Sequence, residues 1–312
     1  MSDDDVFLRH RGLVFSVAYD LLGSVADADD VVQDVYERWA RRSGDVDEPR
    51  AYLARVAANR SLDVLRSSER RRVEYVGPWL PEPLPGGAGT GGAGTGGAGT
   101  GSTGSGGPGP EERAVEADAV SAALLVLLQT LGEHERVCYA LREVFGFSYA
   151  EIARVVDGQE ATVRQAVHRA RRRVQERRER FAVDPAQHAG TVQRFLAAAG
   201  DGDIDGLLAL LAPGAVLTVD GGGLVSAARR PVLGAEAVVR FLLGLRRTRG
   251  QDARVVPAVL NGELAALAVE DGAVTAAFQF AVAAGVVEEL YVVRNPHKLA
   301  RLGGLAQPGR TP

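Results

Sequence analysis

The feature that most limits how this chain can fold is a glycine-rich tract at residues 86–107. The pentapeptide Gly-Gly-Ala-Gly-Thr begins at residue 86 and recurs at residues 91 and 96. Because the tract has little apolar surface to bury and would lose much backbone entropy on ordering, we expect a flexible linker. A phosphate-binding glycine loop would need a lysine and a strand-to-helix context, and the tract has neither. The 312 residues should therefore form separate domains around it.

The segments that flank this tract are predicted to be helical. Apolar residues recur at helical spacing over residues 6–72 and 114–180. The first segment divides near Gly23 and Pro49 into three helices, and the second breaks around residues 145–147 and 157–158. We place an all-helical domain at residues 1–75, the linker at 76–110 and a second all-helical domain at 111–181.

Within the second segment, residues 148–173 have the pattern of a helix-turn-helix. Ser148 begins a short helix, and Glu151 three residues later completes a capping box. Residues 157–160 form the turn, and a second helix of this kind enters the major groove of DNA. Its core face is expected to hold Val163, Val167 and Ala170. The side chains left for bases and phosphates are Thr162, Arg164, Gln165, His168, Arg169 and Arg172.

The charge of the second helix supports DNA contact. The whole chain has a formal net charge of -4, which argues against binding nucleic acid by bulk charge. Residues 161–180 hold eight arginines and two glutamates, a local net charge of +6. A solvated helix face is the usual place for such a run, and the helix macrodipole also favours arginine at a C-terminus. Because the run coincides with the recognition helix, we favour DNA contact, although repressors have this motif too.

From about residue 186 the pattern changes to short segments that alternate apolar and polar residues. Gly, Asn and Asp turns separate expected strands at 215–219, 254–260, 264–269, 274–282 and 286–293. Helices are expected at 191–199, 204–211 and 235–245. This order indicates an α+β domain with a curved antiparallel sheet at residues 187–300, followed by a disordered tail at 301–312.

Composition excludes several kinds of site. Cys138 is the only cysteine, so an intrachain disulfide and a cysteine-based zinc site are excluded, and we expect no metal or cofactor. No apolar run reaches the ~20 residues that span a bilayer. The acidic start, Met-Ser-Asp-Asp-Asp, lacks the basic and apolar runs of a signal peptide. We therefore expect a cytoplasmic protein without membrane contact.

Two further helical segments carry a family resemblance. Residues 27–35, Asp-Ala-Asp-Asp-Val-Val-Gln-Asp-Val, look like region 2.2 of the extracytoplasmic-function (group 4) sigma factors of the sigma-70 family. Residues 49–63 look like regions 2.3 and 2.4, and residues 131–137 with the helix-turn-helix resemble region 4. One departure is Asp157 in the turn, where glycine is usual, although Asp tolerates left-handed backbone geometry. A repressor would have no reason to carry the first two segments.

The resemblance implies a protein that guides the RNA polymerase core, through its β and β′ subunits, to promoter DNA. It assigns core-polymerase binding to acceptors on the region 2.2 helix, namely Asp27, Asp29, Asp30, Gln33 and Asp34. It assigns −10 contact to Tyr52, Arg55, Asn59, Arg60 and Asp63, since aromatic and arginine surfaces capture unstacked bases. The helix-turn-helix would read the −35 element. Trp39 and Tyr36 are expected in the core.

The last domain resembles a SnoaL-like domain of the NTF2-like fold, fused to a sigma factor. The motifs that match this subgroup are residues 75–84 (Tyr-Val-Gly-Pro-Trp-Leu-Pro-Glu-Pro-Leu), 220–223 (Asp-Gly-Gly-Gly) and 295–299 (Asn-Pro-His-Lys-Leu), where His297 replaces the usual Asp. The resemblance implies that the fused domain tunes polymerase engagement without a separate anti-sigma factor. The expected interdomain residues are Trp79, Leu80, Pro81, Asp220, Gly221, Gly222, Asn295, Pro296 and Lys298.

Two other functions remain open from the residues alone. The NTF2-like fold also hosts isomerases and cyclases, in which Asp220 could serve as a general base. The glycines that follow it favour a tight turn or close backbone contact, and no acid–base pair emerges with His188 or His297. We therefore expect no catalytic residues. The alternatives are a helix-turn-helix regulator with an unknown small ligand in this domain, and a bifunctional enzyme.

Overall fold

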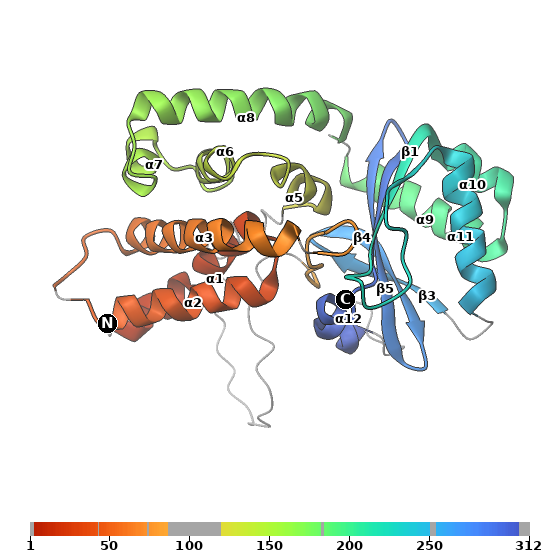
Figure 1. The fold of residues 1–312 in the computed structure, drawn as a ribbon, viewed down its shortest axis with the longest axis horizontal. Coiled ribbons are helices and arrows are strands. Elements are labelled where there is room, and N and C mark those ends of the chain that lie inside the picture. The colour runs from red at the N-terminus through yellow and green to blue at the C-terminus, as the bar shows by residue number, and fades with distance from the viewer. Residues whose placement is uncertain are drawn as a thin grey trace.

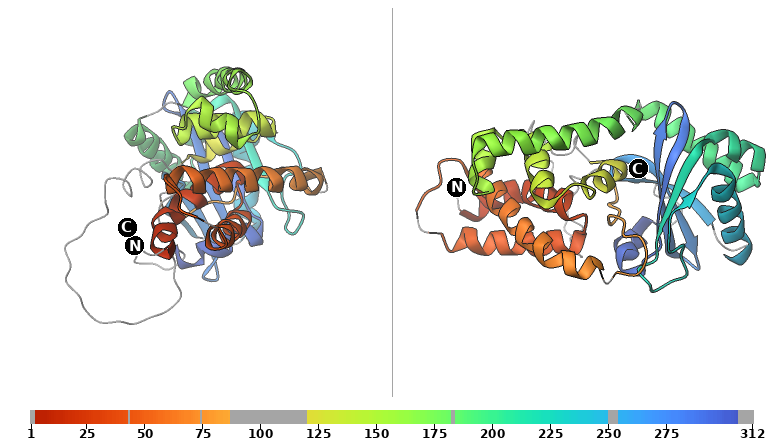
Figure 2. Two further views of the ribbon diagram at one scale, coloured as in Figure 1. Left: turned by 90° about the vertical axis from the view of Figure 1, so that its left-hand side faces the viewer. Right: turned by 45° about the horizontal axis from the view of Figure 1, so that its top comes forward.

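The computed structural model describes residues 3–42, 44–73, 75–86, 120–181, 184–249 and 254–305. The helices that precede and follow the glycine tract lie in two layers, and a helix-covered sheet lies at one end of both layers (Figures 1 and 2). Most of the glycine tract lies outside the described residues, so its flexibility stays a prediction.

The first layer consists of α1 (Asp3–Leu22), α2 (Val25–Ala40) and α3 (Pro49–Val73). Ser24 caps α2, because its hydroxyl oxygen accepts a hydrogen bond from the Asp27 amide at 3.2 Å. Trp39 is buried, as expected. The expectation for Tyr36 was wrong, because it faces the N-terminal turn of α1 at the rim of the core. It is 38% exposed there, and its hydroxyl donates to Asp4 at 3.2 Å.

The second layer contains α5 (Ala122–Leu128), α6 (Glu133–Tyr139), the π-helical turn η1 (Ala140–Val144), α7 (Tyr149–Val155) and α8 (Glu160–Phe181). The capping box of Ser148 and Glu151 is confirmed. Asp157 adopts a left-handed φ of 50°, so the turn forms as expected without glycine at that position. The side chains expected on the core face of α8 are fully buried, namely Val163, Val167 and Ala170.

The C-terminal part confirms the α+β class. Its helices are α9 (Pro185–Asp201), α10 (Ile204–Leu210) and α11 (Ala235–Arg249). Its strands are β1 (Leu211–Asp220), β2 (Val232–Leu233), β3 (Arg254–Leu260), β4 (Glu263–Glu270), β5 (Ala273–Ala283) and β6 (Val286–Val293). Helix α9 starts earlier than expected because Asp184 caps it and Pro185 suits its first turn.

The sheet has the strand order β2-β1-β6-β5-β4-β3 and is mixed. The four strands from β3 to β6 are connected by hairpins, and each is antiparallel to the next. Strand β1, in contrast, pairs with β6 in parallel. The expectation of an antiparallel sheet was therefore wrong. The physical reason is that β1 reaches β3 through α11, and no hairpin fixes its direction relative to β6.

The three hairpins turn through two-residue loops in which both residues have positive φ. The φ values are 51° and 76° for Asn261 and Gly262, and 51° and 76° for Asp271 and Gly272. This is the type I′ geometry that follows the right-handed twist of the strands. The third loop places Ala284 at 48°, where a residue other than glycine, Asn or Asp is unusual.

Both faces of the sheet are covered. Helices α9, α10 and α11 pack on one face around Phe195, Leu207 and Val238. The other face holds α12 (Pro296–Leu299) and η2 (Ala300–Leu305), together with Leu80. The expectation of a disordered tail from residue 301 was wrong for residues 301–305, because Leu302 is fully buried there. Residues 306–312 lie outside the described part.

Candidate nucleic-acid surfaces and interdomain site

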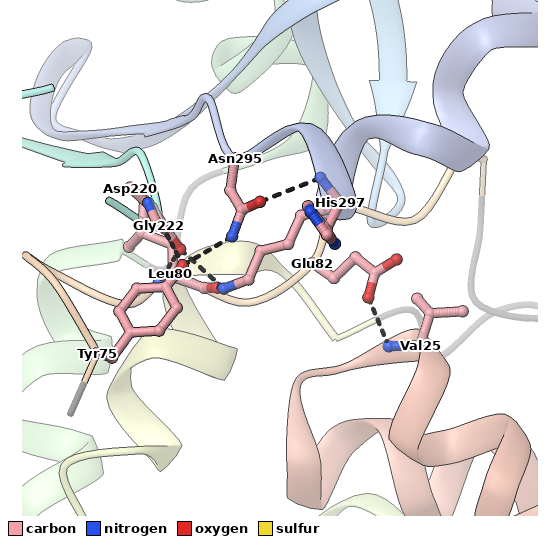
Figure 3. A network of polar contacts seen from close by, with 9 residues as sticks. Val25, Tyr75, Leu80, Glu82, Asp220, Gly222, Asn295 and His297 are labelled. Carbon is pink, nitrogen blue, oxygen red and sulfur yellow. Dashed lines mark hydrogen bonds and ion pairs between the residues drawn. The ribbon is translucent and has the colours of Figure 1, made fainter. Parts of the chain in front are cut away.

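The centre of the contact between the two parts is the carboxylate of Asp220, which has no solvent exposure. Leu217 and Val219 point toward the helix-covered face of the sheet, so Asp220 follows the strand alternation to the opposite face. Its Oδ2 accepts from the Leu80 amide at 2.9 Å, and its Oδ1 accepts from the Tyr75 hydroxyl at 2.5 Å (Figure 3). A strand end thereby binds the segment that leads to the glycine tract.

Lys298 completes this site as the counterion of Asp220. Its Nζ lies 2.7 Å from Asp220 Oδ2 and donates to the carbonyl oxygen of Leu80. The ammonium also lies 3.9 Å from the centroid of the Trp79 ring and 5.3 Å from that of Tyr75. Lys298 is the only lysine in the chain. A compact ammonium with three donors suits this enclosed position, whereas the planar guanidinium of arginine requires a wider one.

Asn295 links the third motif to the same site. Its Oδ1 accepts from the His297 amide at 3.0 Å and caps α12, while its Nδ2 donates to the Tyr75 hydroxyl at 2.9 Å. A Cβ at Gly222 would lie 2.4 Å from that Nδ2, and Gly222 has a φ of 61°. Only glycine fits at this position, which agrees with the close backbone contact expected for the glycines after Asp220. The side chains of His297 and Pro296 are exposed, so His297 contributes its backbone to this contact.

Residues 79–86 also bind the first helical layer. The Glu82 carboxylate accepts from the Val25 amide at 2.9 Å in the first turn of α2, and its amide donates to the Gly23 carbonyl at 2.8 Å. The Tyr19 hydroxyl donates to the Glu82 carbonyl at 2.6 Å. Burial raises the pKa of Glu82. A Cβ at Gly23 would lie 2.9 Å from the Trp79 ring, so the end of α1 packs tightly on the segment.

The tip of the β3–β4 hairpin forms a second buried contact that sequence reasoning missed. Asn261 is 1% exposed, and its Nδ2 donates to the Tyr19 hydroxyl at 2.8 Å. Its Oδ1 accepts from Gln279 Nε2 at 2.9 Å and from the Leu84 amide at 3.2 Å. Its backbone amide donates to the Leu84 carbonyl at 2.8 Å. The only signal in the sequence was an Asn-Gly pair, which is also the commonest hairpin turn.

The two helical layers contact each other directly as well. Arg136 of α6 is 4% exposed, and its guanidinium donates to the Leu21 carbonyl at the end of α1 at 3.1 Å. Helix α3 lies against α6 and α7 (Figure 1). The guanidinium of Arg50 lies 5.7 Å from the Phe147 ring across this contact. The layers therefore share one apolar core, although the glycine tract separates them in sequence.

The residues expected to bind polymerase all lie on α2, but they differ in their solvent exposure and in their ion pairs. Asp30 and Gln33 are exposed, whereas Asp27, Asp29 and Asp34 are partly buried. Two of them already have cationic partners. Asp34 pairs with Arg60 of α3, and Asp29 pairs with Arg301 of η2 at 2.5 Å.

The residues expected at the −10 element all lie on α3. Tyr52 packs at 5.8 Å from the Trp39 ring, and Arg55 lies 5.4 Å from the Tyr52 ring. Asn59 and Arg60 are partly buried and Asp63 is exposed. These residues therefore share one helix. Arg60 also pairs with Asp34 of α2, so the surface expected to bind −10 DNA is next to the surface expected to bind polymerase.

The residues expected at the −35 element are all exposed on α8, namely Thr162, Arg164, Gln165, His168, Arg169 and Arg172. Arg164 is held by Glu160 at 2.9 Å and lies 5.4 Å from the Tyr149 ring. Four of the six, Arg164, Gln165, His168 and Arg169, line a concave surface together with Tyr149 and Arg171. In protein–DNA complexes, arginine is the side chain that most often contacts phosphates and guanine edges.

No metal-binding group of three His, Cys, Asp or Glu side chains occurs among the described residues. None of the helices described has both the length and the apolar character needed to cross a bilayer.

An exposed arginine-rich helix-turn-helix, packed against a three-helix layer that includes the acidic helix α2 and joined to an α+β domain, indicates a multidomain promoter-recognition factor. Residues 6–71 match the family Sigma-70 region 2, and residues 121–174 match the family Sigma-70, region 4.

The similar proteins are also sigma factors. SigJ of Mycobacterium tuberculosis, an ECF RNA polymerase sigma factor, is 36% identical over 82% of this chain and 78% of its own length. The probable ECF RNA polymerase sigma factor SigI of the same species is 31% identical over 95% of both chains. The crystal structure of M. tuberculosis SigJ superposes with a TM-score of 0.71 at 32% identity, covering 96% of this chain and 97% of that one.

The chain belongs to the ECF sigma factors of RNA polymerase, and its likeness to SigJ extends through the C-terminal α+β domain. It directs RNA polymerase to promoters, and sigma factors do so by binding both the polymerase core and promoter DNA.

Proposed function

We propose that the C-terminal domain holds this sigma factor in a compact form that must open before both promoter elements can be bound. The observation that carries the proposal is the buried Asp220 carboxylate, which binds Tyr75 and Leu80 before the tract and Lys298 near the end of the chain. One site therefore couples the position of the C-terminal domain to the linker. In this proposal the three domains span residues 1–75, 111–181 and 187–300.

The compact form is incompatible with simultaneous contact to both elements. At 3.4 Å for each base pair, the −10 and −35 elements are separated by about 80 Å along duplex DNA. Helix α3, proposed to bind the −10 element, instead lies against α6 and α7. The glycine tract gives the two layers the length of chain that such a separation needs.

We assign the residue roles on the same basis. The acidic and amide side chains of α2 bind the β and β′ subunits through Asp27, Asp29, Asp30, Gln33 and Asp34. The −10 element is bound by Tyr52, Arg55, Asn59, Arg60 and Asp63 of α3. The −35 element is bound by Thr162, Arg164, Gln165, His168, Arg169 and Arg172 of α8. The protein acts in the cytoplasm, where its polymerase is.

The C-terminal domain acts as a regulator rather than as an enzyme in this proposal. A general base needs a side chain that can reach a substrate, but Asp220 has no exposure and already accepts four hydrogen bonds. A restraint within the chain also makes a separate anti-sigma factor unnecessary. A small ligand of this domain would act by changing how firmly the domain is docked.

The test compares the full chain with a chain that ends at residue 183. Both are titrated with RNA polymerase core, and run-off transcription is measured on a promoter selected in vitro with the full chain. We expect higher output from the shortened chain. Equal output and equal core affinity would contradict the regulatory role. Promoter binding by the full chain without core polymerase would instead favour a repressor.

A further inference from the structure

The C-terminal turn η2 reaches the helix that we propose binds RNA polymerase. Arg301 of η2 lies 2.5 Å from the carboxylate of Asp29 on α2, a residue 272 positions earlier in the chain. The Arg301 side chain is 53% exposed and that of Asp29 is 33% exposed. The ion pair therefore lies at the surface, where another protein can reach both side chains.

The backbone that carries Arg301 is held in place from both sides. Leu299 is 4% exposed and Leu302 is fully buried, and both pack with Leu80 on the face of the sheet opposite α9, α10 and α11. Lys298 is fixed by Asp220. With its neighbours anchored, Arg301 is presented toward α2 as part of the fold, and pairing with Asp29 requires little ordering of backbone.

A second side chain from outside the helical layer binds the N-terminal end of α2, one turn before Asp29. Glu82 accepts a hydrogen bond from the Val25 amide, which satisfies one of the free amides at the start of the helix. The positive charges of Arg301 and Lys298 lower the pKa of Glu82, against the larger effect of its burial. The first two turns of α2 are thus contacted by a carboxylate from the linker, at Val25, and by an arginine from η2, at Asp29.

We infer that Arg301 occupies the place of a basic side chain of RNA polymerase, so that η2 and the polymerase core compete for Asp29. This inference rests on the proposed function, because it takes α2 as the polymerase-binding helix. Asp29 accepts one guanidinium at this position in the compact form, and a cationic polymerase surface must displace it. Binding of the core to α2 then removes one of the contacts that keep the C-terminal domain docked.

The test uses the full chain with Arg301→Ala, and Arg254→Ala as the control, since Arg254 is an exposed arginine on the edge strand β3 of the same domain. Affinity for the RNA polymerase core is measured at low and high salt. We expect Arg301→Ala to bind the core about two- to five-fold more tightly at low salt, the range for loss of an exposed ion pair, with a smaller difference at high salt. Arg254→Ala should bind as the parent chain does.

A second measurement separates competition from general loosening of the domain. Because Lys298 is the only lysine, its labelling by an amine-reactive ester, read by peptide mass spectrometry, reports whether the C-terminal domain has undocked. Competition predicts tighter core binding by Arg301→Ala with Lys298 still protected. Labelling of Lys298 in the variant before the core is added would overturn the inference, because Arg301 would then be a docking contact only.

The remaining outcomes distinguish this inference from the proposed function. If the chain ending at residue 183 binds the core more tightly but Arg301→Ala does not, the competition is wrong and the regulatory role stands. If neither change has an effect, both are wrong. Asp29→Asn should weaken core binding in both chains, and by less in the full chain, where it also removes the pair with Arg301. Unchanged affinity in both chains would also overturn the competition.

Discussion

Lys298 Nζ lies 2.7 Å from the Asp220 carboxylate, and both side chains are almost fully removed from solvent. A buried ion pair contributes little net stability compared with an apolar pair, but removal of one partner leaves an uncompensated buried charge. This asymmetry makes the pair a sensitive point at which to undock the C-terminal domain.

Lys298→Met should destabilise the docked form by about 3–5 kcal/mol, because it leaves the Asp220 carboxylate buried without a counterion. The free energy of unfolding in urea measures the loss of stability. Faster amide hydrogen exchange at residues 79–86 would show that the loss affects the contact between this segment and the C-terminal domain. The double variant Lys298→Met with Asp220→Asn removes both charges and should recover much of the loss. A double variant no more stable than the single one would argue against an electrostatic cause.

Asn261→Ala should weaken the hairpin-tip contact by about 2–3 kcal/mol beyond its effect on the turn, since it leaves buried partners without hydrogen bonds. Asp271→Ala is the matched control, because Asp271 has the same φ of 51° in the next hairpin and is exposed. The difference between the two variants in unfolding free energy isolates the contact with Tyr19. Equal losses would mean that Asn261 serves only its turn.

Burial raises the pKa of Glu263 from 4.5 to about 7. The folded protein therefore keeps a proton that the unfolded chain releases above about pH 4.5. The stability from this group is complete below that pH and is lost as the pH rises through about 7. Between pH 5 and 8 the parent chain should lose at most about 3 kcal/mol relative to Glu263→Gln. Parallel pH profiles of unfolding free energy for the two proteins would count against this assignment.

Arg164→Ala should weaken −35 binding and lower the slope of log affinity against log salt by about one if Arg164 contacts a phosphate. A loss of about 1–3 kcal/mol confined to one base pair would instead indicate base readout. Binding of the core-bound protein to duplex variants by fluorescence anisotropy distinguishes the two. Arg240→Ala, an exposed arginine on α11, is the control and should change neither quantity.

The helix-turn-helix was predictable because its determinants are local. Ser148 and Glu151 satisfy each other's backbone within one turn, and the apolar spacing of Val163 and Val167 fixes which face of α8 is buried. The motif residues Asp220 and Lys298 were also found from the sequence, through their resemblance to a fused subgroup. That they bind each other was not predicted.

The contacts that sequence reasoning missed join residues with no pattern in common. Asn261 looks like an ordinary turn residue, and Arg136 looks like one more charge on a short helix. Arg301 lies in a stretch expected to be disordered, but Leu302 is buried against the sheet and Arg301 itself pairs with Asp29. Each contact depends on which surfaces meet, and neither propensity nor periodicity contains that information.

The sequence by itself therefore determined most of the helices, the turns, the family and which side chains of α8 are exposed. These depend on hydrogen bonds and apolar spacing within a few residues. The tertiary structure alone decided the parallel pairing of β1 with β6, the pairing of Asp29 with Arg301 and the packing of α3 beneath α6 and α7. The physical reason is that these arrangements arise from burial and charge pairing between distant segments, whose meeting is set by the whole fold.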